Sequence, residues 1–269
     1  MKTKFIKIMF FLAILAPVTC QATIFTEDGT ISGGTYSDVT IESTATVGMT
    51  AGTVETMQIN QMGTLNYYGG SIEDEIYLRD SGILNFEGAT FQRPQGLSMH
   101  NGSSLNFNDG LLSGTLEIHD FVEVVIDGGQ ITDALLNSNG YANTTISDGS
   151  IDWDDMWLNG FSVLDIYGGT VNWFSAGIGD DATLNIYGGI ISFEHGFSLS
   201  NDGEFNVHYS DIIYVNEWDD IIIGYHLLDD SEFMLNQFSQ YEIDQINFVP
   251  EPTTFLLLGL GGLLLRKRK

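Results

Sequence analysis

The amino-acid sequence predicts an all-β protein whose body is a parallel β-solenoid (β-helix) of about ten coils of roughly 20 residues each. Three observations lead to this prediction. An alternating apolar segment that ends in glycine recurs along the chain, its spacing stays between 18 and 21 residues, and the glycine keeps the same phase. The clearest copies are LNYYGGSI (65–72), LDIYGGTV (164–171) and LNIYGGII (184–191). An antiparallel β-sandwich is the alternative, and the near-constant spacing favours the solenoid.

Each repeat contains two kinds of signal. Alternation with period two predicts a half-buried strand, and a glycine at a fixed position predicts a tight turn. The third position is apolar in all ten repeats, and the sixth is glycine in eight, with Ala89 and Ser210 as the exceptions. A second short alternation follows about a dozen residues later, as in IYL (76–78) and LEI (116–118). We therefore expect every coil to read strand, glycine turn, strand, turn.

The chain divides into four segments. Residues 1–22 predict a secretory signal peptide, because three lysines precede a short apolar run and small residues; lipidation of Cys20 is the alternative for this segment. Residues 23–212 carry the solenoid repeats, 213–248 break the rhythm and predict an irregular last coil and a cap, and 249–269 form a distinct tail. Within the cap, 231–243 are compatible with a short helix.

The body is strongly acidic. Between Thr23 and Pro250 two arginines face 35 acids, which gives a formal charge of −33. Such a surface repels phosphate backbones, so nucleic-acid binding is not expected. Solubility or calcium binding are the natural explanations of the acidic excess. Cys20 is the single cysteine and would leave with the signal peptide, so neither disulfides nor thiolate catalysis are expected.

Stacking of coils would turn each repeat position into a column of side chains. The second position carries mostly Asn and predicts an outward amide ladder that serves the structure or contacts a ligand. The tenth position carries Trp153, Trp173, Phe193 and Tyr214, for which a core stack is favoured over a sugar-binding platform. Tyr68, Tyr167 and Tyr187 lie at an outward position and are the candidate glycan contacts.

No catalytic constellation stands out, so an enzyme is not expected. The acids cluster in turns such as EDE (73–75) and DWDD (152–155), but no cluster matches a known calcium loop, and the histidines lack metal-ligand spacing. We predict no metal site, with bound Ca²⁺ as the open alternative. GDD (179–181) and EHG (194–196) weakly resemble β-helical polygalacturonases, but the other motifs of that family are missing.

The tail contrasts with the body. Eleven apolar or glycine residues, 255–265, would form a helix of roughly 16 Å, short for a bilayer core of about 30 Å. The tail begins with Val249, Pro250, Glu251 and Pro252 and ends with Arg266, Lys267, Arg268 and Lys269. This combination resembles the PEP-CTERM sorting signal of Gram-negative-type bacteria. The resemblance implies membrane contact before processing by an exosortase, a membrane cysteine protease-transpeptidase, and then export to the cell surface or matrix.

Together these observations predict an exported, structural or adhesive β-solenoid whose partner is an exopolysaccharide or surface glycan. A carbohydrate-active β-helix enzyme and a glycan-binding module are the alternatives.

Overall fold

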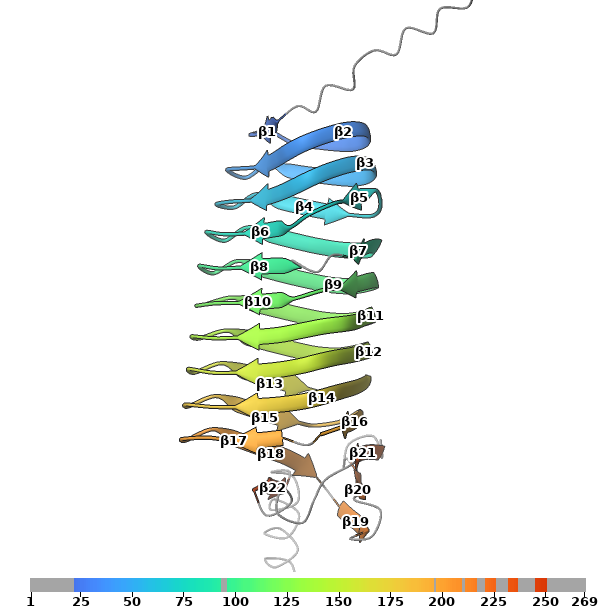
Figure 1. Ribbon diagram of the computed structural model, residues 1–269, viewed down its shortest axis with the longest axis vertical. Helices are drawn as coiled ribbons and strands as arrows, with labels where there is room; N and C mark the ends of the chain where they lie inside the picture. Colours follow the sequence, from blue (N-terminus) through green and yellow to red (C-terminus); the bar gives the residue numbers. More distant parts are fainter. Residues whose placement is uncertain are drawn as a thin grey trace, which may run out of the picture.

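The computed structural model describes residues 22–92, 96–195, 197–209, 211–216, 221–225, 232–236 and 245–250. These residues form a straight rod of about nine turns, all β, in which every coil lies on the one before it (Figure 1). The predicted parallel β-solenoid is confirmed. The predicted signal peptide, apart from Ala22, and the apolar part of the tail lie outside the described residues.

Each coil consists of three short arms. In one coil they are the first arm β4 (Thr64–Tyr67), the second arm β5 (Ser71–Ile72) and the third arm β6 (Ile76–Leu78). We call the turn between the first and second arms the glycine corner. The turn between the third arm and the next coil is the tip corner, and these corners project at the left of Figure 1.

In the other coils two or three arms often run together as one strand. The remaining strands of the rod are β1 (Thr23–Phe25), β2 (Gly29–Ile41), β3 (Thr46–Ile59), β7 (Ile83–Gln92), β8 (Leu97–Met99), β9 (Ser104–Ser113), β10 (Leu116–Ile118), β11 (Glu123–Ser138), β12 (Asn143–Leu158), β13 (Val163–Ile166), β14 (Thr170–Ile178), β15 (Thr183–Ile186), β16 (Ile190–Phe193), β17 (Phe197–Leu199) and β18 (Glu204–Tyr209).

Neighbouring coils pair in parallel and in register, so equivalent residues form columns along the rod. For example, Leu164 pairs with Leu184, which pairs with Phe205. Alternate residues of each arm point inward and are fully buried, while their neighbours face out. No coil could bury its apolar side alone, so the stack of coils is the core.

Aromatic side chains stack inside the rod. Tyr67, Phe86 and Phe107 succeed one another with ring centroids 5.0 and 4.9 Å apart. Trp153 and Trp173 lie 5.9 Å apart and are each 1% exposed. This confirms the core interpretation of these two tenth-position residues, because their rings are not available as a sugar platform.

The glycine corners adopt left-handed backbone. Gly34, Gly52, Gly70, Gly149 and Gly169 have φ between +82° and +114°, a region that side chains with a Cβ avoid. The repeat with alanine at its sixth position is no exception. There the left-handed residue is Gly88, one position earlier, and a register shift between β7 and β9 absorbs the change.

The tip corners also pass through left-handed backbone. Ser43 and Gln61 begin a column that the residues Asp80, Asn101, Asp120, Gly140, Gly160, Asp180 and Asn201 continue, with φ from +51° to +76°. Asn, Asp and Gly are the residues that tolerate this conformation best. The chain therefore satisfies a second backbone constraint per coil that the glycine pattern alone does not reveal.

The C-terminal strands depart from the repeat. β19 (Asp211–Asn216), β20 (Ile221–Tyr225) and β21 (Glu232–Asn236) pair antiparallel with one another, and β21 also pairs in parallel with β16. β22 (Asn247–Pro250) pairs with β18.

Two predictions for this region are wrong. The helix predicted over 231–243 is contradicted over 232–236, where β21 is a strand that completes the open edge of the second arm of the last coil. Residues 231 and 237–243 lie outside the described residues. Tyr214 does not continue the tryptophan column, because its strand turns into the antiparallel meander.

Substitution of a corner glycine should destabilise the rod. A Cβ on Gly149, where φ is +114°, would lie 2.9 Å from the backbone oxygen of Gly128 in the preceding coil. We expect Gly149→Ala to lower the free energy of unfolding by about 1–3 kcal/mol, measured by urea denaturation. Gly48→Ala is the control, because Gly48 has ordinary backbone and its Cβ would meet only Tyr68, at 3.9 Å. Equal costs would refute the backbone explanation.

Tyr67 should make stability depend on alkaline pH. Burial raises the pKa of this tyrosine to about 12, and its single hydroxyl proton is shared between two acceptors, the backbone oxygens of Gly70 (3.2 Å) and Thr90 (3.0 Å). Because the folded pKa exceeds the unfolded value of 10, this contribution is complete below pH 10 and is lost as the pH rises through 12.

Relative to Tyr67→Phe, the natural protein should therefore lose about 1.4 kcal/mol of unfolding free energy per pH unit across this window. Urea midpoints of both proteins from pH 9 to 12 test this. Parallel curves would contradict it.

Candidate functional site

The outward face of the first arms carries two amide ladders. In the first, Asn85 donates to Asn66 at 2.7 Å and Asn106 donates to Asn85 at 2.8 Å. In the second, Asn185 donates to Asp165 at 2.8 Å, Asn206 to Asn185 at 3.0 Å and Asn247 to Asn206 at 3.1 Å. In both, the later coil donates to the earlier one, so the predicted second-position ladder is confirmed as a structural element.

The same arrangement satisfies carboxylates elsewhere. Asn101 donates to Asp80 at 3.2 Å, Asn108 to Glu87 at 2.8 Å and Asn201 to Asp180 at 3.0 Å, in each case from one coil to the coil before. Ser175 donates to Asp155 in the same way. Five described acids therefore accept a hydrogen bond from a side chain of the next coil instead of pairing with a cation: Asp80, Glu87, Asp155, Asp165 and Asp180. Acids also meet acids in register, because Asp127 pairs with Asp148 and Glu87 with Asp109.

An aromatic column lies beside the second amide ladder. Tyr167 and Tyr187 stack with centroids 4.6 Å apart and planes 6° apart, and His208 follows at 4.2 Å. Tyr167 is 52% exposed and Tyr187 is half-buried. Burial, and then the nearby Asp165 carboxylate, raise the pKa of both tyrosines. Tyr68 is equally exposed but lies in a distant coil, so it does not join them.

The stacking limits how these tyrosines could contact a sugar. Parallel rings one coil apart cover each other's faces, so the column presents ring edges and hydroxyl groups to the solvent. Of the two tyrosine rings, only that of Tyr167 has a face open toward the preceding coil, because Ser147 occupies the equivalent position there. The pair is a stack and not a flat platform.

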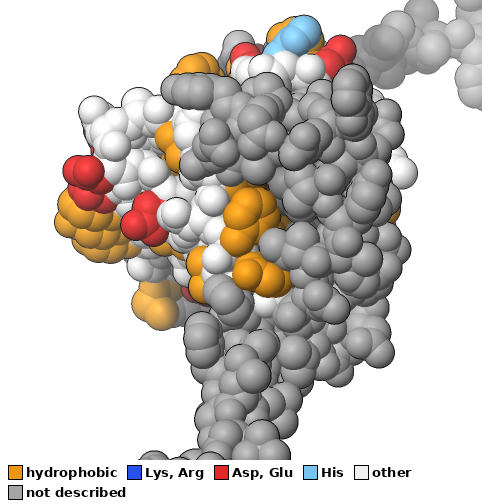
Figure 2. Space-filling view, turned by 90° about the horizontal axis from the view of Figure 1, so that it is seen from below, with side chains coloured by type: hydrophobic (Ala, Val, Ile, Leu, Met, Phe, Trp, Pro, Cys, Tyr) orange, Lys and Arg blue, Asp and Glu red, His pale blue; other side chains and the backbone are white. Residues whose placement is uncertain are grey.

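A second exposed aromatic column, which the repeat pattern did not predict, lies at the tip corners. Phe121, Tyr141 and Phe161 stack with centroids 5.1 and 4.9 Å apart and planes 4° and 9° apart. In the end-on view, hydrophobic side chains protrude with acidic ones beside them on the side where the tip corners lie (Figure 2). The signal was the spacing of 20 residues between aromatics, each following a left-handed tip residue.

Two histidines also meet at the tip corners. His100 and His119 stack at 4.7 Å with planes 5° apart, although nineteen residues separate them. Nε2 of His100 lies 3.0 Å from the Ser98 hydroxyl. Burial, and then the neighbouring His119, lower the pKa of His100.

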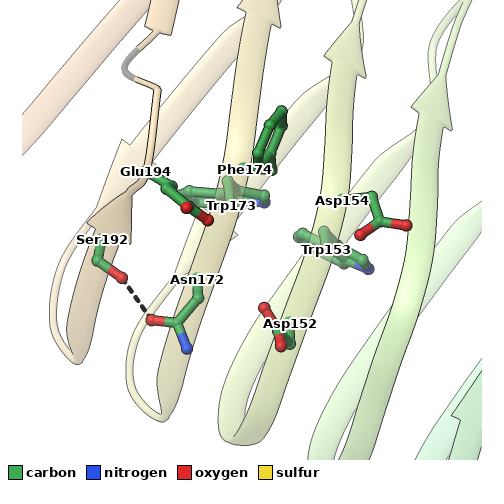
Figure 3. A pocket seen from close by; sticks show the side chains of 8 residues that line it. All are labelled: Asp152, Trp153, Asp154, Asn172, Trp173, Phe174, Ser192 and Glu194. Atoms are coloured by element: carbon green, nitrogen blue, oxygen red, sulfur yellow. Dashed lines mark hydrogen bonds between the residues drawn. The ribbon is translucent and has the colours of Figure 1, made fainter.

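A hollow of ≈ 420 Å³ lies on the outer surface where the second arms of three coils bend. Its rim carries Asp152, Asn172 and Ser192 along one column and Asp154, Phe174 and Glu194 along the next (Figure 3). Trp153 and Trp173 lie beneath it, on the core side. Ser192 donates to Asn172. The rim of the hollow is thus polar and acidic, and it carries one exposed aromatic side chain, Phe174, which is 46% exposed.

Among the described residues, no group of three or more His, Cys, Asp or Glu side chains is placed to hold a metal ion. Arg79 is the one Lys or Arg of the described residues, and its guanidinium lies 5.4 Å from the Tyr77 ring centroid. In the same part of the chain, no helix is long and apolar enough to span a bilayer.

Comparison with known proteins identifies the tail. A family model described as the PEP-CTERM protein-sorting motif matches residues 248–269. No curated protein and no solved structure matches the chain. The motif indicates an exported protein that is processed by an exosortase-type membrane enzyme, as the sequence predicted.

The sorting motif begins at the end of the rod. Val249 and Pro250 belong to β22, where they pair with His208 and Tyr209 of β18. The other predicted motif residues, Glu251, Pro252, Arg266, Lys267, Arg268 and Lys269, lie outside the described residues.

The position of an amide within its ladder should determine what it contributes to stability. Asn85 takes part in two ladder hydrogen bonds and Asn66 in one. At about 1 kcal/mol per bond, Asn85→Ala should lower the free energy of unfolding about twice as much as Asn66→Ala. Chemical denaturation of both variants measures this, and equal losses would show that the ladder bonds do not add.

Proposed function

We propose that the protein is a structural and adhesive rod of the bacterial cell surface or extracellular polysaccharide matrix. Its activity is passive: a stiff solenoid presents repeated columns of side chains to a glycan. The sorting motif supports export, and the fold supports a structural role, because all coils share one continuous core. We also propose that the rod does not cleave its partner.

The observation that carries this proposal is the aromatic and amide face of the later coils. Tyr167 and Tyr187 lie one column from Asp165 and Asn185, so each of these two coils offers an aromatic edge, a hydroxyl and an amide or carboxylate group. A surface that repeats at the coil spacing, about 4.8 Å, suits a polymer that also repeats. Hydrogen-bonding groups beside aromatic surface are the usual composition of a ligand site.

The acidic hollow favours a second candidate function, a carbohydrate-active enzyme. Asp152, Asp154 and Glu194 lie around one cavity, and glycosidases use two carboxyl groups on either side of the scissile bond. Asp152 and Asp154 are both exposed, however, and no buried acid faces this hollow among its described rim residues. We therefore rank binding above hydrolysis.

Size-exclusion chromatography with a panel of bacterial and plant polysaccharides tests the proposal. The protein should co-elute with at least one polymer whose size stays unchanged, with and without added calcium. The double variant Tyr167→Ala/Tyr187→Ala should abolish co-elution, because it removes the aromatic column. Phe174→Ala is the control for loss of an exposed aromatic residue on another face.

The other outcomes are also informative. A fall in polymer size would contradict the passive role, and Asp154→Asn would then show whether the hollow is responsible. Co-elution that the tyrosine variant retains would place binding on a different face. No co-elution with any polymer would refute glycan adhesion. A calcium-dependent gain in particle size by scattering would indicate cross-linking of acidic faces.

A further inference from the structure

The aromatic column of the tip corners has one open end. Phe121 is 69% exposed, Tyr141 55% and Phe161 50%. Both faces of the Tyr141 ring are covered by its neighbours in the stack. Register places Asp181 after Phe161 and Gly102 before Phe121. The Phe121 ring therefore has one face covered by Tyr141 and one face turned toward a glycine.

Gly102 leaves a gap in the column. A Cβ on this residue would find nothing within 4 Å except the Ser81 hydroxyl, at 3.8 Å. Its φ of +75° also favours glycine over residues with side chains. The gap is therefore one ring position in a stack whose other members lie about 5 Å apart, and a flat ligand ring in it would continue the stack.

The surroundings of the gap are acidic. Asp120 directly precedes Phe121, and Asn101, which donates to Asp80, directly precedes Gly102. Asp80, Asn101 and Asp120 are exposed, and they are the left-handed residues of three successive tip corners. Arg79, in the preceding coil, lies 5.4 Å from the Tyr77 ring centroid, and its positive charge also acts on His100, two residues before Gly102. The face of an aromatic ring is electronegative and its edge is electropositive, so the open face of Phe121 and the carboxylates attract the same kind of group.

We propose that the gap between Gly102 and Phe121 binds an amino sugar with a free ammonium group, as part of a cationic glycan. This inference rests on the proposed glycan-binding function and names a second contact, distinct from Tyr167 and Tyr187. The axial C–H face of a pyranose packs on the Phe121 ring. The ammonium group binds the carboxylate of Asp120.

Charge and shape select this occupant. A body with a formal charge of −33 repels uronate and phosphate polymers. A neutral sugar would cover the ring but leave Asp120 without a new partner. A lysine side chain would bring the charge but cover little of the ring face. An amino sugar contacts both the Phe121 ring face and the Asp120 carboxylate. Binding of several rods to one polymer would add avidity.

The test measures binding of a fluorescently labelled short glucosamine oligosaccharide by anisotropy. The comparison probes are the N-acetylglucosamine oligosaccharide of equal length and an oligolysine. A pH of about 6 keeps the sugar amines protonated. We expect the natural protein to bind the glucosamine probe about tenfold more tightly than the acetylated one.

Two variants assign the site, and one variant is the control. Phe121→Ala should weaken glucosamine binding about tenfold. Asp120→Asn, which keeps a residue suited to left-handed backbone, should reduce the preference for glucosamine over its acetylated form. Phe161→Ala removes the same side chain from the opposite end of the column, which Asp181 follows, and should change affinity less than about twofold. Equal thermal midpoints confirm that the variants fold.

Three results would overturn the proposal. Unchanged affinity in Phe121→Ala would exclude the gap. Equal binding of the acetylated probe would exclude the role of the ammonium group. Oligolysine binding of equal strength that is insensitive to Phe121→Ala would show only diffuse charge attraction. Because Tyr167 and Tyr187 are intact in these variants, loss of polymer co-elution in the tyrosine variant and loss of glucosamine binding here are separate results.

Discussion

Parallel stacking requires that every coil turn in the same places as its neighbour. Two turns per coil use left-handed backbone, one at the glycine corner and one at the tip corner. If one coil shifted its turn, it would lose register with the coils on both sides, and its buried side chains would face solvent. The Gly88 corner shows the tolerance of the system: a shift of one residue is absorbed by a local bulge, and register is regained within the same strand.

Register also explains how so acidic a body holds together. Each column repeats a position in the coil, so acids at one position would lie about 4.8 Å apart if every coil had one. The sequence instead places an Asn or Ser one coil after many of the acids, where its side chain donates to the carboxylate. These donors offset part of the repulsion between neighbouring coils, in which acids such as Asp127 and Asp148 also pair in register. For the same reason, a residue without a side chain, such as Gly102, leaves a gap of one position in its column.

The sequence predicted those features in which the same type of residue recurs at the same position of successive coils. Glycine phase and apolar alternation were sufficient to predict the solenoid, the Asn ladder and the buried Trp153–Trp173 pair. The tip corner was missed because its residues, which are Ser, Gln, Asp, Asn and Gly, share a backbone conformation and not a side-chain pattern. The His100–His119 pair and the Phe121 column were missed for a related reason: they become neighbours only when exact register is known.

The candidate glycan contacts show the same limit. Alternation predicted that Tyr167 and Tyr187 face outward, and they do. It could not show that they stack face to face, because ring orientation depends on the next coil and not on the strand that carries it. The hollow at Asp154 and Phe174 arises from a bend shared by three coils, which leaves no local signal in any one of them.

The pairing of β22 with β18 joins the sorting motif directly to the end of the rod. The sorting motif starts within the terminal strand β22, at Val249 and Pro250, so no spacer separates the stacked coils from the motif. A pull on the tail would therefore load the hydrogen bonds of this one terminal strand first. The terminal strand is also where the second amide ladder ends, with Asn247 donating to Asn206. The resistance of the protein to such a pull would therefore depend first on the contacts of β22 with β18.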